Sequence, residues 1–126
     1  MSISISNPSS NSRIPRGFFV SAKDSVLGKE YELSVAFVGE KEMCRLNKQY
    51  RGKSSSTDIL SFPLSKYSGE IVFCMKDVRE QAPIFGRTVP NFLKFLFIHG
   101  LVHLKGYAHG SRMEREEEKI RKEFSI

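Results

Sequence analysis

Residues 89–105 constrain the fold of this chain more than any other segment. Helical spacing puts their apolar side chains on almost every side of a helix, so the rest of the protein has to cover most of its surface. Thr88 can cap such a helix, Pro90 suits its first turn and Gly106 can adopt the left-handed conformation that ends it. The sequence therefore predicts a buried central helix. Its apolar residues are Phe92, Leu93, Phe95, Leu96, Phe97, Ile98, Leu101, Val102 and Leu104.

The other predicted elements are short. Alternating or β-branched residues favour strands at residues 2–6, 33–38, 58–62 and 70–74. Helical spacing favours helices at residues 13–28, 40–50, 77–85 and from 111 onward. Pro63 is expected to end the third strand, and Pro83 disfavours the third helix. Ser111 and Glu114 fit a capping box at the start of the last helix, whose charged residues predict a solvated surface.

These elements predict an α/β (α+β) protein with a single small mixed sheet packed against helices. A chain of 126 residues, 40% of them hydrophobic, has the right size for one compact core. We therefore expect residues 1–126 to form one domain, with residues 1–15 as a short edge strand and a flexible loop. No segment reaches the roughly 20 apolar residues of a membrane span, and the N-terminus lacks the pattern of a secretory signal. The sequence predicts a cytoplasmic protein without a membrane partner.

Charge and cysteine content indicate which partners the protein can bind and whether its cysteines are reduced. Twenty basic and fourteen acidic residues give a net charge of +6, and all of the excess lies in residues 1–110. This balance suits nucleic acid better than a membrane surface, because no amphipathic anchor is visible, although many basic domains bind neither. Cys44 and Cys74 fall in a predicted helix and at a predicted strand end, and they fit reduced packing residues better than a disulfide.

The three histidines of the chain have the spacing of metal ligands. His99 and His103 are four residues apart, on one face of the central helix. Gly106 lets the chain turn back, so that His109 can reach the same ion. Three neutral imidazoles would hold one zinc ion with an open fourth position for water, an arrangement that lowers the pKa of that water to about 7. The histidines therefore predict a catalytic rather than a structural metal site.

Two other interpretations of the histidines are possible from the sequence. Histidines on an apolar helix are often core residues that hydrogen bonds satisfy, but the spacing of all three favours a metal. In metalloproteases of the H-E-x-x-H type, the glutamate after the first histidine is the general base. Gly100 occupies that position in this chain, which weakens a peptidase interpretation.

Four segments resemble one known family. Residues 99–109 read H-G-L-V-H-L-K-G-Y-A-H and resemble the H-G-x-x-H-L-x-G-Y-D-H signature of the YbeY-type endoribonucleases, also described as rRNA maturation factors. Upstream, residues 46–51, 56–63 and 69–72 are similar to segments of the same family, so that the resemblance covers about residues 32–124. Two positions depart from the family: Ala108 and Glu70 both stand where it has aspartate. Ala108 removes a carboxylate that could support His109.

The resemblance implies an activity, a substrate and site residues. The family is a single α/β domain that cleaves single-stranded RNA with a metal ion, in rRNA maturation and ribosome quality control, so the implied partners are rRNA and ribosomal particles. Arg51 matches the active-site arginine of the family, and its planar guanidinium can hold two phosphate oxygens. By motif match alone, Asp58 is expected to orient Arg51 or support a strand end, and Ser61 to line the cleft.

A basic stripe leads toward Arg51. Lys41, Arg45 and Lys48 have the spacing of one helix face, and Lys53 follows in the next loop. This stripe is expected to track an RNA backbone, the alternative being an ordinary solvated helix face. Tyr107 and Phe62 are candidates for base stacking, although aromatic residues in such segments usually belong to the core.

The leading hypothesis is a zinc-dependent, single-strand-specific endoribonuclease with Arg51 and His99 as catalytic residues. Either zinc-bound water or the 2′-hydroxyl of the substrate can serve as its nucleophile, and the sequence leaves both open, together with the oligomeric state. One alternative is a metal-dependent hydrolase of another class, such as a peptidase. Another is a non-catalytic ribosome assembly factor in which the metal only joins His109 to the central helix.

Overall fold

The computed structural model describes residues 3–6 and 14–126, which form an α+β fold with a four-stranded mixed sheet, as the sequence predicts. The predicted loop at residues 7–12 lies outside the described residues. The strands are β1 (Ile3–Ser6), β2 (Glu32–Phe37), β3 (Ile59–Ser65) and β4 (Ser68–Phe73). The helices are α1 (Arg16–Leu27), α2 (Glu40–Arg51), α3 (Met75–Gln81), α4 (Val89–Leu104) and α5 (Ser111–Phe124), with a 3-10 turn η1 (Pro83–Phe85) before α4.

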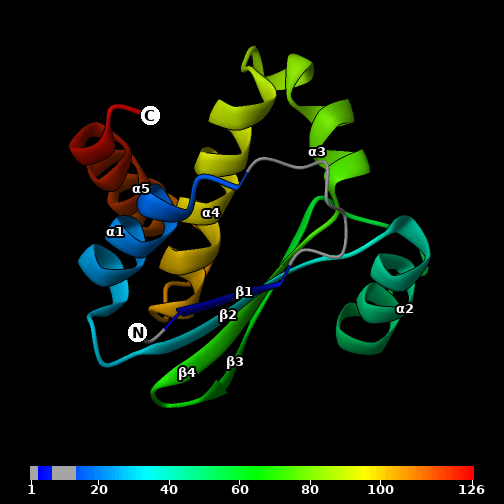
Figure 1. Cartoon of the computed structure of the whole chain (residues 1–126), viewed down its shortest axis with the longest axis horizontal. Helices are drawn as coiled ribbons and strands as arrows, with labels where there is room; N and C mark the ends of the chain where they lie inside the picture. The colour runs from blue at the N-terminus through cyan, green and yellow to red at the C-terminus, as the bar shows by residue number, and fades with distance from the viewer. Residues whose placement is uncertain (1–2, 7–13) are drawn as a thin grey trace.

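The sheet has the strand order β1-β2-β4-β3 (Figure 1). β1 runs parallel to β2, and β2 runs parallel to β4, whereas β3 returns antiparallel along β4. The edge strand expected near the N-terminus is therefore present as β1. β3 lies at the opposite edge of the sheet, and this position matters for the site described below.

Helices cover both faces of this sheet: α1, α4 and α5 lie on one side, and α2 lies on the other (Figure 1). Alternating strand residues serve the two layers. Ile59, Ile71 and Phe73 belong to the main core with α1, α4 and α5. Leu60 and Val72 point the other way and pack in a smaller cluster with Met43 of α2 and Cys74. Both cysteines are free, as predicted.

α4 is the buried central helix that the sequence predicts. The Thr88 side chain accepts a hydrogen bond from the Asn91 amide, Pro90 lies in the first turn, and Gly106 has a φ of 109° after the helix. The helix approaches the sheet closely at Gly100, where an added Cβ would lie 3.0 Å from Ile71 Cδ1 and 3.1 Å from Ile59 Cδ1. The missing side chain at this position therefore sets how near α4 lies to β3 and β4.

Two predicted boundaries are wrong. β3 does not stop at Pro63 but continues to Ser65, with an irregular register between these two residues. Since β4 is the single neighbour of β3 among the described strands, β3 is an edge strand, where a proline without an N–H is tolerated. The helix expected at residues 77–85 begins at Met75 and ends at Gln81, and Pro83 opens the separate turn η1.

The predicted start and surface of α5 also need correction. Gly110 holds the capping position and Ser111 is already helical, so no side chain caps the helix. α5 is not solvated all round either, because Met113, Glu117 and Ile120 are buried. In the described residues 3–6 and 14–126, no helix combines the length and apolar character that crossing a bilayer requires.

Replacing Gly100 by leucine should destabilise the protein by about 1–3 kcal/mol, because the new side chain overpacks against Ile59 and Ile71. Chemical denaturation measures the free energy of unfolding. The matched control is Gly17→Leu in α1, where an added Cβ meets nothing within 4 Å. Its stability should stay level or rise slightly. Equal effects of the two substitutions would contradict close packing at Gly100.

Candidate active site

The three histidines and Arg51 meet in one cleft with a volume of about 440 Å³. Its walls come from the end of α2, from β3, from α4 and from the loop that follows α4. The structure thus brings together residues that are as much as 58 positions apart in the chain, Arg51 to His109. The predicted site residues that line the cleft are Arg51, Asp58, Ser61, His99, His103 and His109.

Both histidines of α4 are held through the same ring nitrogen. His99 Nδ1 lies 3.0 Å from Glu117 Oε2 on α5, and His103 Nδ1 lies 3.3 Å from Ser61 Oγ on β3. A metal-binding histidine typically has one nitrogen in such a contact, which fixes the ring orientation and leaves the other nitrogen for the ion. Nε2 is therefore the nitrogen that each of these rings offers.

His109 approaches both rings from the loop between α4 and α5. Its ring centre lies 5.7 Å from that of His99 and 5.8 Å from that of His103. Two imidazoles on one tetrahedral zinc ion have ring centres about 5 Å apart, so both pairs stand slightly wider than coordination requires. Accordingly, within residues 3–6 and 14–126, no three His, Cys, Asp or Glu side chains already have the geometry of a metal site. The donors are assembled but not closed around a common point.

The electrostatics of the cleft favour a neutral His103. Burial lowers the pKa of the His103 ring, and His109, His99 and Arg51 lower this pKa further by charge repulsion. A neutral imidazole keeps the lone pair that a metal ion needs. His103 therefore has the protonation state of a ligand in ordinary conditions.

Asp58 lies at the start of β3, in the wall of the cleft. Its backbone oxygen accepts a hydrogen bond of 3.0 Å from the Cys74 amide, which ties this end of β3 to the end of β4. The ion pairs of the described residues include none between Asp58 and Arg51. Of the two roles expected for Asp58, the geometry favours support of the strand end.

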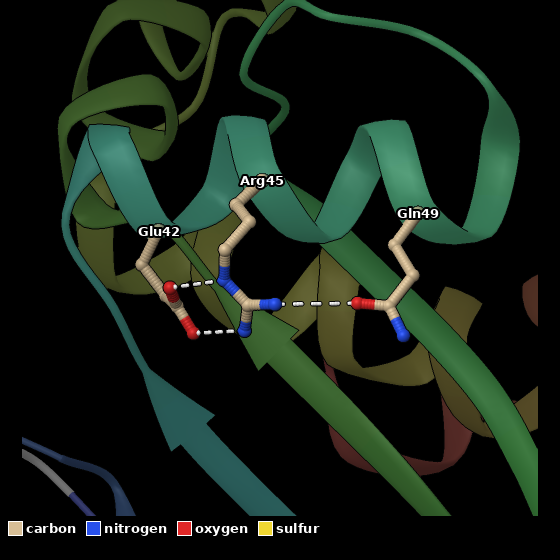
Figure 2. Close-up of polar contacts among 3 residues, drawn as sticks. All are labelled: Glu42, Arg45 and Gln49. Carbon is tan, nitrogen blue, oxygen red and sulfur yellow. Dashed lines mark hydrogen bonds and ion pairs between the residues drawn. The ribbon is translucent and has the colours of Figure 1, made fainter.

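The basic stripe does not reach the cleft. Figure 2 shows Arg45 on the exposed side of α2, where its Nε and Nη2 donate to Glu42 at 2.8 and 2.7 Å and its Nη1 donates to Gln49 at 3.3 Å. Glu42 thus compensates the charge of Arg45. Lys41, Lys48 and Lys53 are exposed, but α2 contributes only its last two residues to the cleft. For Arg45, the geometry favours an ordinary solvated helix face.

Glu117 is a site residue that is not predicted from the sequence, because its charge resembles those of its solvated neighbours on the last helix. Its side chain is only 8% exposed, it contacts His99, and its other oxygen lies 3.7 Å from Arg121 Nη1. A signal was present in the sequence. Met113, Glu117 and Ile120 share one helix face, so that a carboxylate stands in an otherwise apolar stripe.

The two aromatic candidates have different surroundings. Tyr107 packs against the main core, as aromatic residues in such segments usually do. Phe62 lines the cleft and stacks on Tyr50, which lies within the family segment at residues 46–51. Ala108 is exposed, and it offers no carboxylate to His109.

The fold and the cleft together define a class: a small α+β protein that presents three histidines and an arginine at the edge of its sheet. A family model described as "Endoribonuclease YbeY" matches residues 4–125. The chain belongs to this family. The resemblance seen in the sequence is thereby confirmed, and family membership supports an endoribonuclease role and an RNA substrate.

Individual relatives agree with the family match. An endoribonuclease YbeY of Alkaliphilus metalliredigens is 37% identical over 108 residues, which are 77% of this chain and 70% of the relative. That of Sulfurimonas denitrificans is 39% identical over 109 residues, covering 81% of this chain and 77% of the relative. Among solved structures, TM1509 from Thermotoga maritima has 30% identity and a TM-score of 0.66, with 98% of this chain and 91% of that chain covered.

Asp58→Asn should stabilise the protein at pH 7 but not at pH 3. Burial raises the pKa of the Asp58 carboxyl, so ionising this group costs free energy in the folded state. In the native chain, the protonated Asp58 carboxyl is fully compatible with folding below the unfolded pKa of about 3.9, and this contribution to stability is lost as the pH rises through the folded pKa. Asparagine stays neutral at every pH, so it avoids that loss at pH 7. Thermal unfolding followed by circular dichroism at both pH values tests this. A melting difference that is the same at pH 3 and pH 7 would contradict it.

Proposed function

We propose that this protein is a zinc-dependent, single-strand-specific endoribonuclease that acts in the cytoplasm on rRNA and ribosomal particles, in small-subunit rRNA maturation and ribosome quality control. The observation that carries the proposal is the meeting of Arg51 with three histidines in one cleft, in a chain of the endoribonuclease YbeY family. The net charge of +6 is in keeping with an RNA partner.

The donor set of the cleft fits zinc. Three imidazoles suit this ion, and three protein ligands with an open position are typical of catalytic zinc sites. Ser61 and Glu117 already orient His103 and His99, so that closure needs only a small approach of the rings. When bound, the metal would supply positive charge beside the scissile phosphate.

Arg51 supplies the second positive charge. Its side chain is exposed at the cleft, and in the described residues it forms no ion pair, so its guanidinium remains available to two phosphate oxygens. Charge that grows on a phosphodiester during cleavage is stabilised by donors that already point at it. Arg51 and the histidines stand on different elements, so the phosphate can lie between them.

The size of the cleft favours a single strand. A volume of about 440 Å³ is that of a small-molecule pocket. A flexible strand can present one phosphodiester and its neighbours to such a cleft, whereas a duplex holds its bases and phosphates in a rigid, wider helix.

The two alternatives lack a supporting observation. A zinc peptidase of the H-E-x-x-H type needs a glutamate at position 100, where this chain has glycine and where an added Cβ would lie only 3.0 Å from Ile71 and 3.1 Å from Ile59. A purely structural metal usually takes four protein ligands. Neither cysteine lines the cleft, so no thiolate stands ready as the fourth.

The decisive experiment removes and restores the metal. Protein stripped with a chelator should not cut a single-stranded RNA, and zinc should restore cutting, which His99→Ala should abolish in every condition. Arg51→Ala should lower kcat by about 100-fold, as expected for the loss of one charge-stabilising donor, while Arg79→Ala, an exposed arginine on α3, serves as the matched control. Equal cutting by stripped, zinc-loaded and His99→Ala protein would refute the metal mechanism.

Glu117 should act through the metal affinity of His99. Glu117→Ala removes the partner of His99 Nδ1 and should raise the dissociation constant for zinc by 10- to 100-fold. Competition with a chromophoric chelator measures this constant without any RNA. Glu118→Ala, at an exposed neighbouring position, is the control and should bind zinc as the native chain does. Equal zinc affinity of the two variants would exclude this role, provided that circular dichroism shows both folded.

A further inference from the structure

Two aromatic rings form a stacked pair at the edge of the cleft. The ring centres of Tyr50 and Phe62 are 4.3 Å apart, and the ring planes differ by 16°. Tyr50 is in the last turn of α2, and Phe62 is in the middle of β3. α2 and β3 also pack against each other through the smaller apolar cluster. The ring contact between them holds the Tyr50 ring in one orientation.

The pair borders the groups proposed to act on the phosphate. Both rings line the same cleft as the histidines. Arg51 follows Tyr50 directly in the chain, and Ser61, which contacts His103, directly precedes Phe62. A nucleotide whose phosphate lies against Arg51 therefore has its base within reach of Tyr50.

Tyr50 is 50% exposed although one face of its ring is covered by Phe62. A half-exposed ring that a second ring supports from behind is a surface suited to stacking, and stacking on aromatic side chains is how proteins bind unpaired bases with little sequence preference. In a duplex the bases are already stacked on one another, so such a surface selects single strands.

We propose that the Tyr50–Phe62 pair is a base-binding subsite, in which the exposed face of Tyr50 stacks on the nucleobase next to the phosphate held by Arg51. This inference rests on the proposed function for its substrate, RNA. It adds a physical source of single-strand preference that is independent of the metal.

A second half-exposed aromatic residue is less suited to this role. Phe85 lines another cavity, of about 420 Å³, on the far side of His99 and His109. Two carboxylates, Glu114 and Glu117, line that cavity beside one guanidinium, Arg121, and carboxylates repel an RNA backbone. The cleft that Tyr50 lines, by contrast, also contains Arg51, whose positive charge attracts an RNA backbone.

Binding of a fluorescent single-stranded RNA, measured by anisotropy in the presence of EDTA, tests the subsite without cleavage. Tyr50→Ala should weaken binding by roughly 10-fold, the size expected for one lost base stack, and Tyr50→Phe, which keeps the ring, should restore it. The matched control is Tyr67→Ala, which removes a tyrosine that is 62% exposed and does not line the cleft. Native affinity in Tyr50→Ala would overturn the proposal.

A set of oligonucleotides, each with one abasic ribose, locates the base. At one position the missing base should weaken binding to the native chain as much as Tyr50→Ala does, and the two changes together should have no additional effect. Additive effects at every position would overturn stacking on Tyr50. A chain that binds RNA but does not cut it with zinc refutes the nuclease mechanism and leaves this test valid, whereas a chain that neither binds nor cuts RNA overturns both.

Discussion

The contact between α4 and the sheet is the constraint on which the rest of the structure depends. Gly100 lies where the helix meets Ile59 and Ile71, and no other residue fits there without displacing one of these side chains. Because this contact fixes the depth and rotation of α4, it also fixes where His99 and His103 emerge at the edge of the sheet. The same packing that stabilises the core therefore positions two of the three proposed ligands.

Polar contacts then join distant elements to this helix. Ser61 of β3 holds His103, and Glu117 of α5 holds His99, so that residues 42 and 18 positions away along the chain orient the two rings. Each contact pairs a half-buried imidazole nitrogen, which would otherwise cost free energy, and selects the nitrogen that faces the cleft. Among the three proposed ligands, His109 has no such hydrogen bond within the described part of the chain, and Ala108 provides no carboxylate beside it.

Much of the fold was predictable because it is encoded locally. The all-round apolar character of residues 89–105 indicated a central helix, and alternation or helical spacing located most strands and helices. The predictions from Pro63 and Ser111 were wrong because the effect of each residue depends on its exact position in the strand or helix. Proline ends a strand where the neighbouring strand needs a backbone N–H that proline lacks, and sheet order places β3 at an edge. Serine caps a helix only from the position before the first turn, and the chain places Gly110 there.

The sequence by itself determined the burial of α4, the spacing of its two histidines and the motifs that mark the family, because each depends on residues close together in the chain. Only the tertiary structure decided which side chains share the cleft: Glu117 beside His99, Ser61 beside His103 and Tyr50 stacked on Phe62. It also separated Arg51, at the cleft, from Arg45, bound to Glu42. Such partnerships depend on how whole elements pack, and periodicity along the chain carries no record of that packing.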